Sequence, residues 1–299
     1  MKEKSKLRLL FVVNPKSGSA YTVNYRGIIS EFSEKEDFEW EILETSGKDD
    51  PENIRKNIET FHPDSVIAVG GDGTVNMVAV ELLGKDINLG IIPSGSANGL
   101  AFNLGIPVNF RRALNFNLTS EAGPMDVIKI NDCHFCLHLS DVGINARIVK
   151  RFEKEGSKGM FGYGKQLFKE LREGKTYFTS YIEAPGQRRK KMNAEMIVIA
   201  NAKSFGTGAM INPTGQINDG QFEIIIIRPY PWWFVFTFTY TAFTGNLHKM
   251  KYVKIFSVSE AKITLPQKQE CQVDGEIIPE ADLLKVEIVP GALKVIGAK

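Results

Sequence analysis

Cysteine is scarce in this chain of 299 residues, which has three, at positions 133, 136 and 271. An odd, low count without a recognisable signal peptide excludes a disulfide framework and favours a reducing compartment. The first residues are basic, but Asn14 and Pro15 interrupt the apolar run that follows them. A secretory leader is therefore not expected.

A strong charge imbalance is also lacking, since the formal net charge is +2 and the pI is about 8.3. That balance is too mild for nucleic acid, so no nucleic-acid partner is expected. Long apolar runs are missing as well, because the richest one, residues 230–245, is short and contains four threonines. It is too short to span a membrane. We therefore expect a cytoplasmic protein that contacts membranes reversibly.

The first part of the chain shows an alternation of apolar strands and helical segments. The strands are predicted at residues 7–13, 38–45, 65–69 and 89–92. The helices are predicted at residues 21–32, 51–61 and 75–83. Such alternation is typical of an open α/β sheet with parallel strands. We place this α/β domain at residues 1–123, with residues 291–299 returning to it.

After residue 124 the apolar segments become short and are separated by turn residues, which is typical of an antiparallel β domain. The strands are predicted at residues 127–130, 135–139, 178–184, 192–200, 222–227, 262–265, 270–273 and 284–289. One helix is predicted at residues 163–173. The stretch 230–245 fits both periods, and we favour a helix there. Residues 124–290 are thus predicted to form a β-sandwich.

Three turns that follow predicted parallel strands carry the chemistry. They are Asn14-Pro15-Lys16-Ser17-Gly18, Gly70-Gly71-Asp72-Gly73-Thr74-Val75-Asn76 and Pro93-Ser94-Gly95-Ser96-Ala97-Asn98. The carboxyl ends of such strands form the ligand crevice of an open α/β sheet. Glycines let backbone N–H groups approach a phosphate, hydroxyls can donate to it, and a following helix adds its dipole. The first or third turn alone also fits an ordinary connection, whereas the second strongly indicates a phosphate loop.

These turns resemble the signature of the diacylglycerol kinase catalytic-domain family, which includes bacterial soluble lipid kinases, sphingosine kinases and ceramide kinases. The resemblance extends along nearly the whole chain, through residues 212–220 and the Asp-Gly-Glu triplet at 274–276. It implies a three-layer, NAD-kinase-like α/β domain followed by a β-sandwich.

The resemblance also implies which residues form the sites. Those that would bind ATP are Asn14, Pro15, Lys16, Ser17, Gly18, Thr45, Gly70, Gly71, Asp72, Gly73, Thr74, Val75, Asn76 and Ser96. Phosphoryl transfer to an alcohol needs a proton acceptor and a metal ion. Glu276 is implied as the catalytic residue, with Asp274 and Asp72 helping to hold Mg²⁺ or the base. Which carboxylate takes the proton stays open, because such a triplet alone is usually a polar hairpin turn.

A separate structural Mg²⁺ is implied at Asp219, with the backbone oxygens of Gln216 and Gln221 as further ligands. The residues alone indicate an ordinary turn there. The sequence departs from the family pattern at these two glutamines, at Ser96, which replaces threonine, and at Met77, which stands where many members have glutamate.

Two other functions share features with this sequence. NAD kinases share the Gly-Gly-Asp-Gly loop, but residues 117–121 do not form their Asn-Glu pair. A non-catalytic nucleotide-binding regulator is left open by Met77, while the intact Asp72, Asp274 and Glu276 argue against it. The Cys133/Cys136 pair has the spacing of a metal or redox site but no second pair at a suitable distance.

We therefore expect an ATP- and Mg²⁺-dependent lipid kinase with diacylglycerol as the default substrate. ATP and the acceptor lipid are expected to meet between the two domains. A basic tip at residues 188–191 fits a solvated loop, and its functional interpretation is a weak anchor to anionic membranes. The aromatic stretch 232–243 is expected either in the core or in the wall of an acyl-chain slot. A homodimer is left open.

Overall fold

The computed structural model describes residues 6–18, 23–154, 177–204, 209–231 and 233–299. The chain divides into two compact units, Met1–Met125 with Ala292–Lys299, and Asp126–Gly291. The sequence had placed these boundaries after residues 123 and 290. None of the helices in the described ranges is long and apolar enough to cross a membrane. The helix predicted at 163–173 lies outside the described residues.

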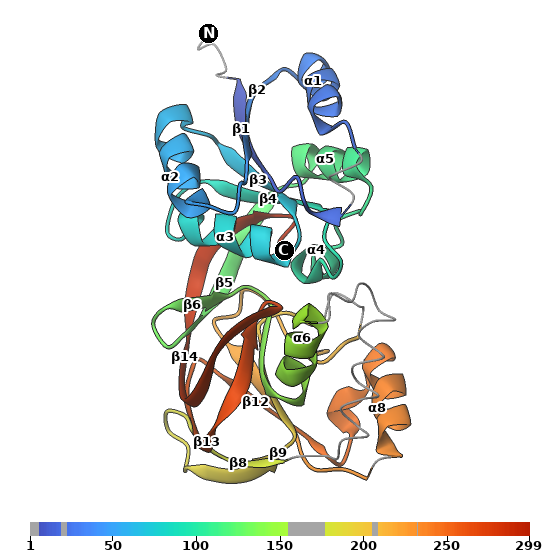
Figure 1. Ribbon diagram of the computed structural model, residues 1–299, viewed down its shortest axis with the longest axis vertical. Helices are drawn as coiled ribbons and strands as arrows, with labels where there is room; N and C mark the ends of the chain where they lie inside the picture. The colour runs from blue at the N-terminus through green and yellow to red at the C-terminus, as the bar shows by residue number, and fades with distance from the viewer. Residues whose placement is uncertain (1–5, 19–22, 155–176, 205–208, 232) are drawn as a thin grey trace. The chain divides into compact units, whose positions relative to one another are not determined.

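The N-terminal unit is a parallel sheet between two layers of helices. Its elements are β1 (Leu7–Val13), α1 (Tyr25–Glu36), β2 (Phe38–Glu44), α2 (Asp50–Phe61), β3 (Ser65–Gly70), α3 (Asp72–Leu82), β4 (Asn88–Pro93), α4 (Gly99–Asn103) and α5 (Phe110–Thr119). The strand order is β4-β3-β1-β2, and the end of β14 (Glu276–Ile296) pairs with β4. Figure 1 shows α2 and α3 on one side of this sheet and α1 and α5 on the other. The predicted three-layer α/β fold is confirmed.

The direction in which successive strands are added to the sheet reverses between β1 and β3, and we call this position the reversal point. Val13 pairs with Glu44 on one side and with Val69 on the other, so the four strands end at one edge. The chain passes from β1 to β2 on one side of this point, and from β3 to β4 on the other. Loops that diverge in this way leave a ligand crevice at the carboxyl ends of the strands.

Several helix boundaries differ from the sequence prediction. α1 begins at Tyr25 and not at 21, because the Asn24 side chain caps it by accepting the Gly27 N–H at 3.0 Å. α3 begins at Asp72 and not at 75, so most of the predicted phosphate loop is the first turn of a helix. α4 and α5 were not predicted. Asn117 holds α5 on β4 by bonding both the N–H and the C=O of Ile91.

The C-terminal unit is built from antiparallel strands. Its elements are β5 (Ala122–Ile130, which begins in the N-terminal unit), β6 (His134–Cys136), β7 (Leu139–Gly143), α6 (Ile144–Lys154), β8 (Phe178–Glu183), β9 (Lys190–Ala194), β10 (Met196–Ala200), β11 (Phe222–Ile227), α8 (Phe234–Phe243), the short 3₁₀ helix η2 (Leu247–Lys249), β12 (Val253–Val258), β13 (Glu260–Val273) and β14. One sheet has the order β12-β11-β10-β7-β13, and β13 also pairs with β8 and β14.

Alternating side chains give this sheet two buried faces. In β10, Ile197 and Ile199 pack on one face with residues of β5, β6, β13 and β14. Met196 and Val198 pack on the other face with Leu247 of η2 and Phe238 of α8. The predicted strand-rich sandwich is confirmed, and the helix favoured for the stretch 230–245 is confirmed as α8.

Several strand predictions were wrong. Residues 135–139 do not form one strand, because the Leu137 and His138 amides bond the Asp274 carboxylate and leave the ladder between β6 and β7. The strand predicted at 192–200 breaks at Glu195, whose N–H donates to Ile227 and whose C=O accepts from Ile144. The strands predicted at 262–265 and 270–273 are one strand, β13, which stays paired with β14 through register shifts. β12 and α6 were not predicted.

The residues of the predicted basic tip, 188–191, lie only partly in a turn, and membrane contact there stays a prediction. Lys190 and Lys191 belong to strand β9 and pair with β8. Arg189 is held back by Glu183 at 3.2 Å and by the Tyr181 ring, whose centroid lies 4.4 Å from the guanidinium carbon. The turn before β9 therefore does not present four cations together.

Candidate active site

The turn after β1 is tied to the start of α3. The Asn14 N–H donates to the Val69 carbonyl at 2.9 Å, and its side-chain oxygen accepts the Lys16 N–H at 3.0 Å. Its side-chain amide donates to the Thr74 hydroxyl at 3.3 Å. Asn14 thus fixes this turn across the reversal point, while Lys16 stays exposed. Thr45 lies at the same edge, where its N–H donates to the Val13 carbonyl at 2.8 Å.

The two glycines before Asp72 lie close to neighbouring atoms, Gly70 too close for a Cβ and Gly71 with little room for one. A Cβ on Gly70 would lie 2.3 Å from the Thr74 hydroxyl oxygen, and one on Gly71 would lie 3.2 Å from the Gly95 Cα. Gly71 is the N-cap of α3 and offers no side-chain hydrogen bond to the helix. The first N–H groups of α3 therefore lack a capping side chain, and such a helix end attracts anions.

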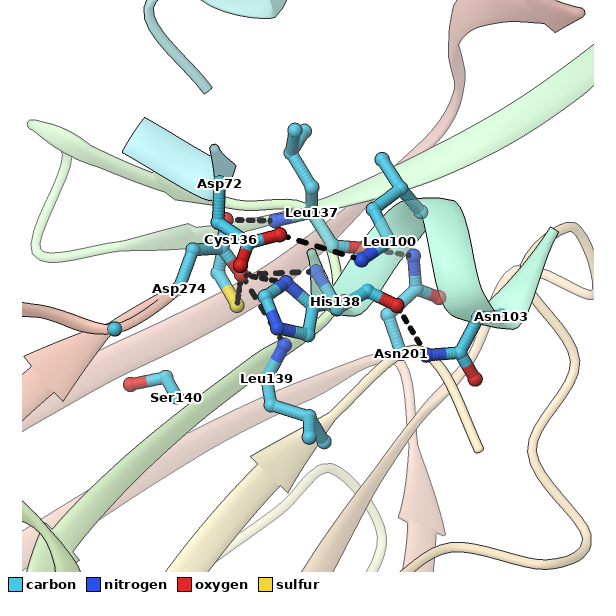
Figure 2. Close-up of polar contacts among 12 residues, drawn as sticks. Asp72, Leu100, Asn103, Cys136, Leu137, His138, Leu139, Ser140, Asn201 and Asp274 are labelled. Carbon is cyan, nitrogen blue, oxygen red and sulfur yellow. Dashed lines mark hydrogen bonds and ion pairs between the residues drawn. The ribbon is translucent and has the colours of Figure 1, made fainter. Parts of the chain in front are cut away.

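Asp72 stands in the first turn of α3, where its Oδ1 accepts the Leu100 N–H of α4 at 3.4 Å (Figure 2). A carboxylate is stabilised by the positive end of a helix but repels a phosphate. Asp72 is therefore suited to hold a cation that in turn holds phosphate oxygens, and not to contact phosphate itself.

The turn after β4 packs on the other two. The Ser94 N–H donates to the Gly70 carbonyl at 2.9 Å, and its hydroxyl donates to the Ser17 hydroxyl at 3.2 Å. A Cβ on Gly18, whose φ is +33°, would lie 2.3 Å from the Ser94 carbonyl oxygen. The Asn98 side chain closes this turn, because it accepts the Gly95 N–H and donates to the Gly95 carbonyl. Ser96, between these two residues, is exposed. The structure thus brings the three predicted turns together at one edge of the sheet.

In the C-terminal unit, the Asp-Gly-Glu triplet begins with a two-residue hairpin turn. Val273 pairs with Glu276, and Asp274 and Gly275 between them have φ values of 48° and 91°. Positive φ at both central positions is typical of a type I′ turn, for which Asp-Gly is favoured. The turn leaves Glu276 exposed as the first residue of β14.

Asp274 is only 4% exposed, and both of its oxygens are occupied. Oδ2 accepts the Leu137 N–H at 2.7 Å, and Oδ1 accepts those of His138 and Leu139 at 3.0 and 3.2 Å (Figure 2). Oδ1 also lies 2.7 Å from His138 Nδ1 and accepts the Cys136 thiol at 3.4 Å. Burial alone would raise the pKa of this carboxyl, but the charge and hydrogen bonds of His138 and the backbone N–H groups lower it to about 2.

A carboxylate with so low a pKa and so many donors is a poor proton acceptor. Asp274 instead fastens the hairpin turn to the β6–β7 junction. It therefore fixes the position from which Glu276 extends.

Sequence reasoning missed a polar cluster behind this turn. Gln272 is buried; its Oε1 accepts the Gly275 N–H at 2.6 Å, and its amide donates to Asp141. Asn145, in the first turn of α6, donates to the same Asp141 oxygen. Burial raises the pKa of Asp141 to about 6 against these hydrogen bonds. The available signal was a glutamine between two apolar residues, Cys271 and Val273.

The predicted structural metal ligands lie in an exposed turn. Asp219, Gln216 and Gln221 are exposed, and Asp219 Oδ1 accepts the Gln221 N–H at 3.0 Å. Asp126 supports this turn from the buried side, because its two oxygens accept the N–H groups of Gly220 and Gly291. Asp219 offers one exposed carboxylate, which fits Mg²⁺ if backbone carbonyls and water supply the other ligands.

The described residues do not support a cysteine metal or redox site or an NAD-kinase Asn-Glu pair. Among the residues that the structure describes, no group of three His, Cys, Asp or Glu side chains could hold a metal ion. Cys133 is exposed, whereas Cys136 is buried, and burial raises the pKa of its thiol. Asn117, considered for an NAD kinase pair, is a buried packing residue.

Known proteins resemble the chain over most of its length. The family described as diacylglycerol kinase catalytic domain matches residues 8–130, and the YegS C-terminal NAD kinase beta sandwich-like domain matches residues 140–297. A Klebsiella pneumoniae protein named "Probable lipid kinase YegS-like" is 28% identical over 246 residues, which are 81% of this chain and 79% of that protein. A Yersinia enterocolitica protein of the same name is 26% identical over 77% of this chain and 78% of its own.

Two solved structures show the same fold. A candidate diacylglycerol kinase from Bacillus anthracis superposes with a TM-score of 0.78 at 21% identity, over 98% of both chains. An NAD kinase from Archaeoglobus fulgidus in complex with ATP superposes with a TM-score of 0.57 at 13% identity, over 98% of this chain and 94% of that chain.

Proposed function

The chain belongs to the lipid kinases that join a diacylglycerol kinase catalytic domain to a YegS-type C-terminal domain, and we propose that it phosphorylates diacylglycerol with ATP and Mg²⁺. The ATP-dependent lipid kinase reaction is what membership of this family establishes. Diacylglycerol, the metal ion and the residues that act are the proposal. The observation that carries it is the convergence of the three turns at one edge of the N-terminal sheet.

The nucleotide phosphates would bind at that edge. The first N–H groups of α3 and the hydroxyls of Ser17 and Thr74 can donate to phosphate oxygens, and Lys16 can add a positive charge. Mg²⁺, when bound, would neutralise the charge that develops on the transferred phosphoryl group. Asp72 is the carboxylate at this edge that is suited to hold the ion.

Glu276 would accept the proton of the acceptor hydroxyl. It is exposed, and it follows a turn whose position is fixed by Asp274 and Gln272. Removing a general base typically lowers the rate about 10²–10⁴-fold. Asp274 is assigned here as a positioning residue. The exposed Asp219 would hold a second, structural Mg²⁺ with backbone carbonyls.

The acceptor would be reached from the cytoplasmic surface of a membrane. Diacylglycerol stays in the bilayer, so an enzyme that acts on it has to bind the membrane surface reversibly. Anionic headgroups attract basic residues near that surface, and salt weakens this attraction. We expect activity to rise with anionic lipid and to fall at high salt.

The test is transfer of radiolabel from ATP to lipids in mixed micelles containing diacylglycerol, sphingosine or ceramide, with NAD as a soluble alternative. The expected result is labelled phosphatidic acid that requires Mg²⁺ and forms about 10²–10⁴-fold more slowly with Glu276→Gln. Label in sphingosine or ceramide alone would overturn the choice of substrate. Label in NAD with none in lipid would overturn the proposed function.

A further inference from the structure

Helix α8 exposes aromatic side chains along its outer face. Trp233 before the helix is 61% exposed, Tyr240 is 70% exposed and Phe243 is 51% exposed. Trp233, Thr237, Tyr240 and Thr244 are spaced by four, three and four residues, so they lie on one side of the helix. All four are exposed. We call Trp233, Tyr240 and Phe243 the aromatic face.

The opposite side of α8 is already packed. The Phe234 ring lies 5.1 Å from the Tyr230 ring and 4.7 Å from the Tyr252 ring, and Phe238 stacks on Tyr230 at 6.3 Å. Ala242, one turn further on, is buried. The helix is thus anchored to the sheet by its packed side, while the aromatic face stays largely exposed, as expected of a surface that meets a partner.

Threonine hydroxyls beside this face bond inside the helix. Thr244 Oγ1 donates to the Tyr240 carbonyl at 3.0 Å, and Thr241 Oγ1 donates to the Thr237 carbonyl at 2.9 Å. A hydroxyl whose donor is already used loses little when water is removed. The hydroxyls of Thr241 and Thr244 therefore do not prevent this surface from entering an apolar environment.

Charge on the flanks has one sign. The sequence contains no Asp or Glu between Glu223 and Glu260, in a chain that otherwise carries 35 of them. In that interval His248, Lys249, Lys251 and Lys254 are exposed. Lys251 Nζ lies 5.5 Å from the centroid of the Tyr252 ring, which packs on Phe234 in the first turn of α8.

The second lysine lies at the other end of the helix. Lys249 Nζ donates to Asn246 Oδ1 at 2.8 Å, and the Asn246 N–H donates to the Thr241 carbonyl near the end of α8. Cations therefore flank the helix at both ends.

We propose that the aromatic face of α8 docks on the surface of an anionic bilayer, with Lys249 and Lys251 at the headgroups. Trp and Tyr prefer the interface between headgroups and acyl chains, and lysines beside them gain from anionic lipid. A second copy fits less well, because two-fold symmetry would bring the same uncompensated lysines together. This proposal rests on the proposed function in one respect, namely that an enzyme with a lipid acceptor has to contact the bilayer surface.

Sedimentation with vesicles, without nucleotide, tests this surface. The vesicles are phosphatidylcholine alone, or phosphatidylcholine and phosphatidylglycerol in equal parts. Tyr240→Ser/Phe243→Ser should weaken binding to both by about 30-fold, because two aromatic side chains no longer enter the interface. Lys249→Gln/Lys251→Gln should weaken binding to the anionic vesicles alone, by about 30-fold.

Two matched controls use exposed residues of the N-terminal unit. Lys56→Gln/Lys85→Gln removes the same charge, and Val108→Ser removes an apolar side chain that is 69% exposed. Both should bind like the unchanged protein, and all variants should keep its thermal unfolding midpoint. Unchanged binding of the aromatic variant would overturn the proposal, as would equal losses in the controls. A lipid-free dimer that the aromatic variant dissociates would assign the face to a second copy instead.

Because nucleotide is omitted, vesicle binding is separate from phosphoryl transfer. Binding that follows these expectations while no lipid is phosphorylated would refute the proposed function and leave the docking surface standing. If the protein phosphorylates diacylglycerol but its vesicle binding is unchanged by the α8 substitutions, the docking surface is refuted and the proposed function stands.

Discussion

In the N-terminal unit, the signature aspartate Asp72 is half-buried in the first turn of α3 and accepts a long hydrogen bond of 3.4 Å. In the C-terminal unit, Asp274 is also beside a glycine, but it accepts three backbone N–H groups at 2.7–3.2 Å and contacts an imidazole. Aspartates in two glycine-flanked motifs therefore have different surroundings, and the buried one supports the architecture of its unit. Burial separates the two aspartates, whereas motif spacing does not.

The largest effect should come from removing the buried carboxylate. Asp274→Ala leaves three backbone N–H groups and His138 without their acceptor, which should lower the free energy of unfolding by about 3–5 kcal/mol. Asp72→Ala, its counterpart, should cost less than about 1 kcal/mol, because Asp72 is only half-buried and lies in the first turn of a helix, where a carboxylate gains modestly from the helix dipole. Urea unfolding of both variants measures the contrast. Equal losses would remove the distinction between the two aspartates.

Glu276 should show the opposite behaviour to Asp274. Glu276→Gln keeps the shape of an exposed side chain, so the urea midpoint should not move, while the rate of lipid phosphorylation should fall about 10²–10⁴-fold. ATP-induced thermal stabilisation should persist, because that signal comes from the N-terminal unit. A loss below tenfold would transfer the role of proton acceptor to Asp72.

Asp141, a second buried carboxylate in the C-terminal unit, should affect stability with a pH dependence opposite to that of Asp274. The pKa of Asp141 is raised from 3.8 to about 6, so the folded state binds its proton more tightly than the unfolded state does. Its contribution to stability is full below pH 4 and is lost as the pH rises through 6, by about 3 kcal/mol.

Asp141→Asn removes this titration. The difference in unfolding free energy between variant and unchanged protein should therefore grow in favour of the variant from pH 4 to pH 7. Asp274, whose pKa is lowered, contributes stability above pH 4 that is lost as the pH falls towards 2. A difference between variant and unchanged protein that is flat with pH would show that Asp141 does not titrate in this range.

Features that depend on neighbouring residues could be predicted from the sequence, whereas features that depend on contacts distant in sequence could not. β3 was predictable because all six of its residues are buried, which gives a continuous apolar run. The Asp-Gly turn was predictable from local backbone preference. The break between β6 and β7 was not, because the acceptor for the Leu137 amide lies 137 residues away in the sequence.

The same limit applies to the sites. Sequence motifs located the three turns, and the structure shows that they pack together. Sequence did not reveal that Gly70 and Gly71 lie close to neighbours in space, since those contacts involve the Thr74 side chain and the separate turn at Gly95. It also missed Gln272 and Asp141, whose partners are on different strands. The catalytic and metal roles assigned from the resemblance stay predictions.

The packing of the turns can be tested at Gly18. Gly18→Ala places a Cβ 2.3 Å from the Ser94 carbonyl oxygen and should displace the turn after β4. Stabilisation by ATP at 100 times its dissociation constant is worth about 2.7 kcal/mol and should be largely lost. Gly84→Ala is the matched control, because Gly84 also has a positive φ but no atom within 4 Å of its added Cβ. Full stabilisation of Gly18→Ala by ATP would separate this turn from nucleotide binding.

The smallest effect is expected at Asp219, the exposed counterpart of the buried Asp126. If Asp219 holds Mg²⁺ with backbone carbonyls, Mg²⁺ should raise the thermal unfolding midpoint of the unchanged protein above its value in EDTA. Asp219→Ala should remove that increment, on the order of 1 kcal/mol, and should unfold at the same temperature as the unchanged protein in EDTA. Glu280→Ala, at an exposed carboxylate outside this turn, is the control and should keep the increment. Equal destabilisation of Asp219→Ala with and without Mg²⁺ would assign Asp219 to the turn alone, through its hydrogen bond from the Gln221 N–H.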